Sequence, residues 1–167
     1  MMTRRTTLKA TFSGLASAAG LSSLFAGSAV AAGAAKTTYE VVKTDAEWQK
    51  ILSPAAFNVL RKAGTERAFT SPLNDEKRAG TFHCAGCNQP LFSSKTKFDS
   101  GTGWPSFWQP LEKSAIDDVA DNSLFMKRVE TLCHRCGGHL GHVFDDGPKP
   151  TGLRYCMNGV ALSFKPA

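Results

Sequence analysis

The sequence of 167 residues lacks several features that would place it in a specialised class. Its basic residues are scattered rather than clustered, although the formal net charge is +6, and this argues against a nucleic-acid-binding surface. Beyond residue 34 there is no apolar run long enough to remain in a membrane. What is present is the ordinary composition of one globular domain, with 42% hydrophobic and 20% charged residues.

The N-terminus carries a pattern typical of an export signal. Arg4 and Arg5 precede a soft apolar stretch that continues to about Val30, and small residues then offer cleavage sites up to Ala34. Weak hydrophobicity together with an arginine pair is typical of a bacterial twin-arginine signal. We therefore expect residues 1–34 to be a signal peptide that is removed, and the mature protein to lie in the periplasm. A retained membrane anchor is the alternative.

The two parts of the mature chain have different patterns. Asp45 and then Ser53-Pro54 are N-terminal signals for two helices, and Gly64 stands where the second helix should end. Residues 65–80 are polar and predict an irregular surface connection, after which the segments become short and rich in β-formers. This predicts a mainly β domain with two helices laid against an antiparallel core. The predicted strand segments are 91–92, 119–120, 124–132, 143–144, 153–157 and 160–164.

Four of the five cysteines form two matched C-x-x-C pairs. Two such turns can place four thiolates at the corners of a tetrahedron, which is the geometry that zinc prefers. We therefore predict one structural zinc ion. Two alternatives stay open: a pair of structural disulfides, which an oxidising compartment favours, and a thioredoxin-like redox motif. The predicted ligands are Cys84, Cys87, Cys133 and Cys136.

The fifth cysteine, Cys156, has no partner once the other four hold a metal ion. An odd cysteine in an exported protein is a candidate reactive thiol. On a strand, Arg154 and Asn158 would share its face, and a nearby cation favours the thiolate form of a cysteine. A buried, inert cysteine is the alternative.

Two further segments supply candidate site residues. His139 and His142 stand three apart in a glycine-rich segment that runs on to Asp146, and such a pair can donate protons near neutral pH. Trp104 and Phe107 belong to G-T-G-W-P-S-F-W, a loop whose composition suits the apolar wall of a pocket. We take both as candidate substrate contacts. A tryptophan-rich loop packed over the core is the alternative.

Taken together, C-A-G-C, G-T-G-W-P-S-F, C-H-R-C-G-G-H-L-G-H-V-F-D-D-G-P and L-R-Y-C-M-N resemble the methionine sulfoxide reductase B family, over residues 39–164. The resemblance implies two antiparallel sheets with peripheral helices and a structural zinc site. It also implies an enzyme that reduces methionine-R-sulfoxide in oxidised proteins, in line with the use of one enzyme for each sulfoxide epimer. We expect it to work as a monomer on exported proteins, without nucleic acid or stable membrane insertion.

The resemblance implies roles for the residues of the reacting centre. Cys156 is expected to attack the sulfoxide sulfur as a thiolate. His142 is expected to supply a proton to the sulfoxide oxygen, with His139 beside it. Asp146 is expected to orient His142.

Other matched residues are expected to surround the thiol. Arg154 and Asn158 match residues that charge or shape its surroundings, and Trp104 matches the aromatic wall that receives the methyl group. One position departs from the family pattern, because many members place a resolving cysteine where this chain has Thr102. No other free cysteine remains. We therefore expect an external thiol, from a thioredoxin-like protein or a small molecule, to resolve the Cys156 sulfenic acid.

Two other classes of function stay open from the residues alone. A non-catalytic zinc module that binds protein or nucleic acid would explain four cysteines but would leave Cys156 and the histidine pair without a role. A thiol–disulfide oxidoreductase would use a C-x-x-C motif without zinc and without sulfoxide reduction.

Overall fold

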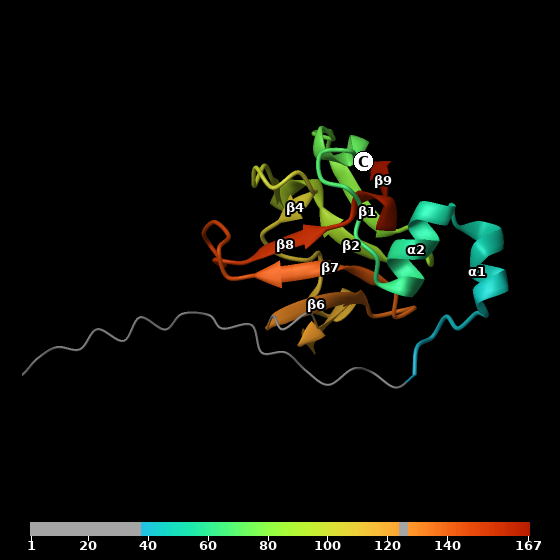
Figure 1. Cartoon of the computed structure of the whole chain (residues 1–167). Coiled ribbons are helices and arrows are strands. Elements are labelled where there is room, and N and C mark those ends of the chain that lie inside the picture. The colour runs from blue at the N-terminus through green and yellow to red at the C-terminus, as the bar shows by residue number, and fades with distance from the viewer. Residues whose placement is uncertain (1–37, 124–126) are drawn as a thin grey trace, which may run out of the picture.

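The computed structural model describes residues 38–123 and 127–167. Two antiparallel β-sheets form the centre of the molecule and two helices pack at one side (Figure 1). This confirms the predicted mainly β class. The predicted export signal, residues 1–34, lies outside the described residues. Among the helices that are described, none has the length and apolar character needed to cross a membrane.

The first helix, α1 (Asp45–Ile51), has Thr44 as its N-cap, so the prediction of Asp45 as the cap is wrong by one residue. The Thr44 hydroxyl accepts a hydrogen bond from the Glu47 amide at 3.3 Å, and the Glu47 carboxylate accepts one from the Thr44 amide at 2.7 Å. Glu47 stands three residues after Thr44, and this capping box decides where the helix begins. Asp45 becomes the first helical residue, where its negative charge favours the helix N-terminus.

The second helix, α2 (Pro54–Lys62), begins as predicted, with the Ser53 hydroxyl accepting a hydrogen bond from the third helical amide at 3.1 Å. Its end differs from the prediction. The residue in the left-handed conformation is Ala63, with φ of 51°, while the Gly64 amide donates to the Asn58 carbonyl at 3.0 Å. The buried residues of α2 are Ala56, Phe57, Val59 and Leu60.

Every neighbouring pair of strands in the two sheets is antiparallel. The smaller sheet has the order β2 (Pro90–Ser93), β1 (Gly80–Cys84), β9 (Leu162–Pro166). The larger sheet has the order β3 (Lys97–Phe98), β4 (Ser106–Phe107), β8 (Arg154–Met157), β7 (His139–Phe144), β6 (Arg128–Cys133), β5 (Ile116–Asp121). Short 3₁₀ helices occur at Pro72–Asn74, Ser94–Thr96, Lys113–Ala115 and Gly159–Ala161. The last of these occupies the first residues of the strand predicted at 160–164, so β9 begins only at Leu162.

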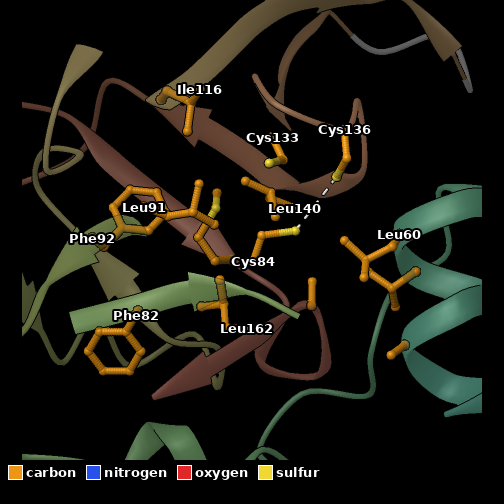
Figure 2. Close-up of a cluster of buried hydrophobic side chains, with 14 of the residues drawn as sticks. Leu60, Phe82, Cys84, Leu91, Phe92, Ile116, Cys133, Cys136, Leu140 and Leu162 are labelled. Atoms are coloured by element: carbon orange, nitrogen blue, oxygen red, sulfur yellow. Dashed lines mark hydrogen bonds between the residues drawn. The ribbon is translucent and has the colours of Figure 1, made fainter. Parts of the chain in front are cut away.

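Aromatic rings form the centre of the buried core. Phe107 stacks on Phe92 with ring centroids 4.5 Å apart and meets Phe82 edge-on at 4.9 Å. Figure 2 shows that the same buried cluster continues through Leu140 to Cys84. The core therefore reaches from the aromatic rings to the first cysteine pair.

The register of the larger sheet brings predicted site residues to one face. Cys156 of β8 lies opposite Ser106 of β4 and opposite His142 of β7. Because side chains alternate along a strand, the next pair, Phe107 and Tyr155, points to the other face, and both of these residues are buried. The strand that carries the candidate thiol thus has one face in the core and the other at the site.

Candidate active site and metal centre

Four cysteine sulfurs converge where β1 and β6 end, as the sequence predicts. The Cys84 and Cys136 sulfurs are 3.8 Å apart, and the Cys87 and Cys133 sulfurs are 3.4 Å apart. All four lie within 4.8 Å of one another, and Figure 2 shows three of these side chains meeting. A tetrahedron of sulfurs about 2.3 Å from a central zinc ion has edges of about 3.8 Å. The cluster therefore has the dimensions of a four-thiolate metal site.

The distances do not agree with the alternative of two disulfides. A disulfide bond is about 2.05 Å long, whereas all five cysteines, which lie within the described residues, are free. Hydrogen bonds among the four clustered thiols raise the pKa of Cys84 and Cys133 and lower the pKa of Cys87 and Cys136. Four thiolates this close repel one another, so a central cation is what would allow all four to ionise together.

Helix α2 packs directly against this cluster (Figure 2). A Cβ atom at Gly138 would lie 2.8 Å from Leu60 Cδ2 and 3.4 Å from the Cys136 sulfur, so a side chain there would displace Leu60. The Arg61 guanidinium donates a hydrogen bond to the Cys136 carbonyl at 3.0 Å. The helix and the turn between β6 and β7 are thereby joined at the cysteines.

Cys156 stands outside the cluster, half-buried on β8. Its sulfur is 3.7 Å from the Thr102 hydroxyl oxygen, and the Ser100 hydroxyl lies 2.8 Å from that of Thr102. The Pro105 carbonyl accepts a hydrogen bond from the Met157 amide at 2.9 Å. The glycine-rich loop before β4 is thus fixed beside the thiol.

The Arg154 guanidinium lies beside Cys156 and is held by Asp146. Its Nε and Nη2 donate to the two carboxylate oxygens of Asp146 at 2.8 and 2.7 Å, and the guanidinium lies 4.4 Å from the centre of the Phe144 ring. The hydrogen bonds to Asp146, together with the negative charge of ionised Cys156, raise the pKa of Arg154 against the opposing effect of burial. The prediction that Asp146 orients His142 is therefore wrong, because its carboxylate is paired with Arg154.

The two histidines have carboxylate partners that the sequence analysis missed. His142 Nε2 is 2.8 Å from Asp121 Oδ2, and His139 Nδ1 is 2.6 Å from Glu130 Oε1. The two rings meet edge to face, with centroids 5.4 Å apart. In each histidine the second ring nitrogen is not bonded to the partner carboxylate. This is Nδ1 in His142 and Nε2 in His139. Glu130 falls within the strand predicted at 124–132, and its place beside Arg128 on one face of that strand is the signal that could have found it.

Burial lowers the pKa of His142, and its hydrogen bond to Asp121 opposes this shift. The positive charges of Arg128 and His139 lower the pKa further. Arg128 donates to the same Asp121 carboxylate at 2.7 Å. A protonated His142 in this environment is a stronger acid than an ordinary imidazolium.

The predicted surface connection 65–80 is irregular apart from one short 3₁₀ helix and Gly80, which begins β1, and it supplies a residue that the sequence analysis does not single out. The Glu66 carbonyl accepts a hydrogen bond from Trp104 Nε1 at 2.9 Å. The Glu66 amide donates a hydrogen bond to the Asn158 side-chain oxygen at 2.8 Å, and the Glu66 carboxylate accepts one from the Gly159 amide at 2.6 Å. Asn158 lies just beyond the end of β8 and is buried, so Glu66 joins it to the Trp104 loop.

Of the two aromatic residues predicted to contact substrate, only Trp104 is placed to do so. Trp104 is half-buried and lines a cavity of about 500 Å³. Phe107 is 0% exposed and packs between Phe92 and Phe82, so the prediction of a substrate contact is wrong for it. The cause is the alternation along β4, which turns Ser106 toward Cys156 and Phe107 into the core.

Comparisons with known proteins place the chain among relatives. The SelR domain family matches residues 52–166. A protein of Pseudomonas putida named Peptide methionine sulfoxide reductase MsrB is 57% identical over 127 residues, covering 76% of this chain and 96% of that protein. Proteins of the same name are 54% identical in Leptospira interrogans, over 76% of this chain and 97% of that protein, and in Methanosarcina barkeri, over 75% and 88%.

Proposed function

The chain belongs to the SelR domain family and is, like its relatives, an oxidoreductase; from this premise we propose that it reduces peptide-bound methionine-R-sulfoxide to methionine. The observation that carries the proposal is the position of Cys156. Its thiol is free and half-buried, beside the Arg154 guanidinium and opposite His142. A thiol in these surroundings is suited to attack an oxidised thioether.

The proposed reaction transfers one oxygen atom between two sulfurs. The Cys156 thiolate attacks the sulfoxide sulfur and a proton is delivered to the sulfoxide oxygen. The sulfur–oxygen bond of the substrate breaks, and the oxygen ends on Cys156 as a sulfenic acid. The substrate sulfur is reduced by two electrons and the cysteine sulfur is oxidised by two.

We assign the proton transfer to His142, through the ring nitrogen that is not hydrogen-bonded to Asp121. His139 lies behind it and shares the same region of the site. Arg154 stabilises the thiolate by its charge, and Trp104 receives the methyl group on sulfur. Asn158 positions this wall through its hydrogen bond to Glu66.

Recycling requires a second thiol, which we propose comes from another molecule. The Thr102 hydroxyl of the glycine-rich loop lies 3.7 Å from the Cys156 sulfur, and the other four cysteines form the cluster. A thioredoxin-like protein or a small thiol would condense with the sulfenic acid, releasing water and forming a mixed disulfide. A further thiol would then release reduced Cys156 and leave the reductant as a disulfide.

For the four-cysteine cluster we propose one zinc ion, held by Cys84, Cys87, Cys133 and Cys136. Four sulfur donors at tetrahedral spacing suit zinc. The ion would supply a structural cross-link and take no part in the oxygen transfer. Export of the folded protein would allow the ion to bind before the thiols meet an oxidant.

We further propose that residues 1–34 direct export by the twin-arginine route, and that the mature monomer repairs oxidised proteins in the periplasm. The supporting features are the Arg4-Arg5 pair, the soft apolar stretch and the small residues that follow it. Mass spectrometry of the exported protein should find a chain that begins after Ala31 or Ala34. A mature protein that retains Met1 would contradict cleavage.

The activity is tested with a methionine-R-sulfoxide peptide and dithiothreitol as the reductant. Wild-type protein should reduce the peptide, and Cys156→Ser should lose turnover while keeping its fold and its metal. A non-catalytic zinc module would show no turnover in either form. A C-x-x-C oxidoreductase would instead reduce a disulfide substrate and leave the sulfoxide unchanged.

A further inference from the structure

We propose that the cavity beside Trp104 binds the residue next to methionine sulfoxide in the substrate polypeptide, and that it favours an apolar or aromatic side chain there. This inference rests on the proposed function and specifies the kind of substrate. It starts from Phe69, which lines the same cavity.

Phe69 is unusually exposed for a large apolar residue. Its exposed fraction is 74%, and its backbone has a φ of 65°. The left-handed region is unfavourable for an aromatic residue, and backbone strain of this kind is concentrated in binding sites. Burial in the core does not explain Phe69, because the ring faces solvent.

The position of Phe69 is nevertheless fixed by the glycine-rich loop before β4. Its amide donates a hydrogen bond to the Gly103 carbonyl at 2.8 Å, and the Asn74 side-chain amide donates to the same carbonyl at 3.0 Å. A Cβ atom at Gly103 would lie 2.8 Å from Phe69 Cδ2, so glycine lets the ring rest on the loop. Phe69 is therefore held in an exposed position rather than left loose.

Phe69 and Trp104 are both lining residues of the cavity, which has a volume of about 500 Å³. Pockets of this size are typical of small-ligand sites, and one amino-acid side chain with its adjoining backbone is smaller than that. Two aromatic rings supply an apolar surface on which a side chain can stack. The cavity is thus suited to a single residue of a polypeptide.

The loop that lines the cavity also contacts the thiol of β8. Thr102 contacts the Cys156 sulfur at 3.7 Å, and Pro105, a cavity residue, is hydrogen-bonded to Met157. Consecutive Cα atoms of a polypeptide are about 3.8 Å apart. When the sulfoxide of a bound chain reaches Cys156, the adjacent residues are those that can enter the cavity.

The charges at the rim of the cavity balance. Carboxylates of Asp75, Glu76 and Asp99 line it together with the ammonium groups of Lys77 and Lys97, and the Arg78 guanidinium pairs with Glu76. The preference for an apolar or aromatic neighbour therefore comes from the rings of Phe69 and Trp104 rather than from charge.

The test compares a peptide with a single-residue substrate. Phe69→Asn removes the ring, and asparagine tolerates the left-handed backbone. The variant should raise the KM of a peptide with Phe next to methionine-R-sulfoxide roughly tenfold. The KM of N-acetyl-methionine-R-sulfoxide amide should stay unchanged. Val42→Asn, which removes an apolar residue that is 78% exposed, serves as the matched control and should change neither KM.

The outcomes separate this inference from the proposed function. An unchanged KM for the peptide, or equal changes for both substrates, would overturn the cavity assignment while the activity stands. A wild-type protein that reduces neither the peptide nor N-acetyl-methionine-R-sulfoxide amide would overturn the proposed function itself. If Phe69→Asn fails to fold, wild-type KM values for Phe-flanked and Asp-flanked peptides decide: a lower KM for the Phe-flanked peptide supports the inference and equal values overturn it.

Discussion

Single residues of the site are positioned by carboxylates. Asp146 holds the Arg154 guanidinium through two hydrogen bonds, and Asp121 holds His142 through one. Glu130 does the same for the second histidine of the pair. Each cationic or basic group near Cys156 therefore has its own acidic partner, which fixes where it can donate a proton or present a charge.

Asp121→Asn should move the pH dependence of turnover to lower pH. The Asp121 carboxylate raises the pKa of His142 against the larger effect of burial, so the variant leaves His142 with a lower pKa. If protonated His142 supplies the proton, kcat falls as pH rises through this pKa, and in the variant the fall begins at lower pH. Measuring kcat against pH tests this, with Asp145→Asn, an exposed carboxylate, as the control. An unchanged profile would assign the proton to another group.

Thr102→Cys should convert external recycling into internal recycling. The Thr102 oxygen lies 3.7 Å from the Cys156 sulfur, so a small adjustment would bring two sulfurs to a bond length of about 2.05 Å. After reaction with substrate and no reductant, the variant should contain a disulfide between positions 102 and 156, detected by non-reducing peptide mapping. The wild type should instead give a Cys156 sulfenic acid. A wild-type disulfide that includes Cys156 would contradict the external thiol.

Whole elements were predictable where their signals are local. Ser53 and Pro54 predicted the start of α2, and the two C-x-x-C turns predicted the cysteine cluster, because each signal acts within a few residues. Contacts across strands were not predictable in this way. Asp121 and Glu130 reach the histidines through the register of β5, β6 and β7, which composition does not set.

Two misassigned or missed residues have the same physical origin. The position of Phe107 near Trp104 in the sequence predicts a substrate contact, yet one step along β4 turns its side chain into the core. Glu66 was not singled out because its role arises from contacts with Trp104 and Asn158, far away in the chain. Both depend on tertiary packing rather than on local pattern.

Gly138→Ala should weaken the contact between α2 and the cysteine cluster. The added methyl group would lie 2.8 Å from Leu60 Cδ2, and overpacking of this kind costs about 1–3 kcal/mol. Urea unfolding should therefore give a lower free energy of unfolding for the variant. In a Leu60→Ala background the same substitution should cost less, because the clashing group is gone. Equal costs in the two backgrounds would show that Leu60 is not the obstacle.

The molecule as a whole is joined at the cysteine cluster. Cys84 ends β1 of the smaller sheet and Cys133 ends β6 of the larger sheet (Figure 1). Leu60 of α2 belongs to the same buried cluster as these two cysteines (Figure 2). The second pair is followed directly by β7, which begins at His139. The position of the histidine pair therefore depends on the cluster, although Cys156 is not part of it.

Removal of the zinc ion proposed for the cluster should consequently abolish activity and lower stability together. Structural zinc contributes about 10–16 kcal/mol in small zinc domains, comparable to the total stability of about 5–15 kcal/mol of an ordinary protein. Chelator treatment under reducing conditions should lower the unfolding temperature by more than about 10 °C and make the thiols of the cluster reactive. Added zinc should restore the unfolding temperature and turnover in parallel, because β6, which ends at Cys133, pairs with β7, which carries the two histidines. A metal-depleted protein that kept its unfolding temperature would show that packing alone joins the two sheets.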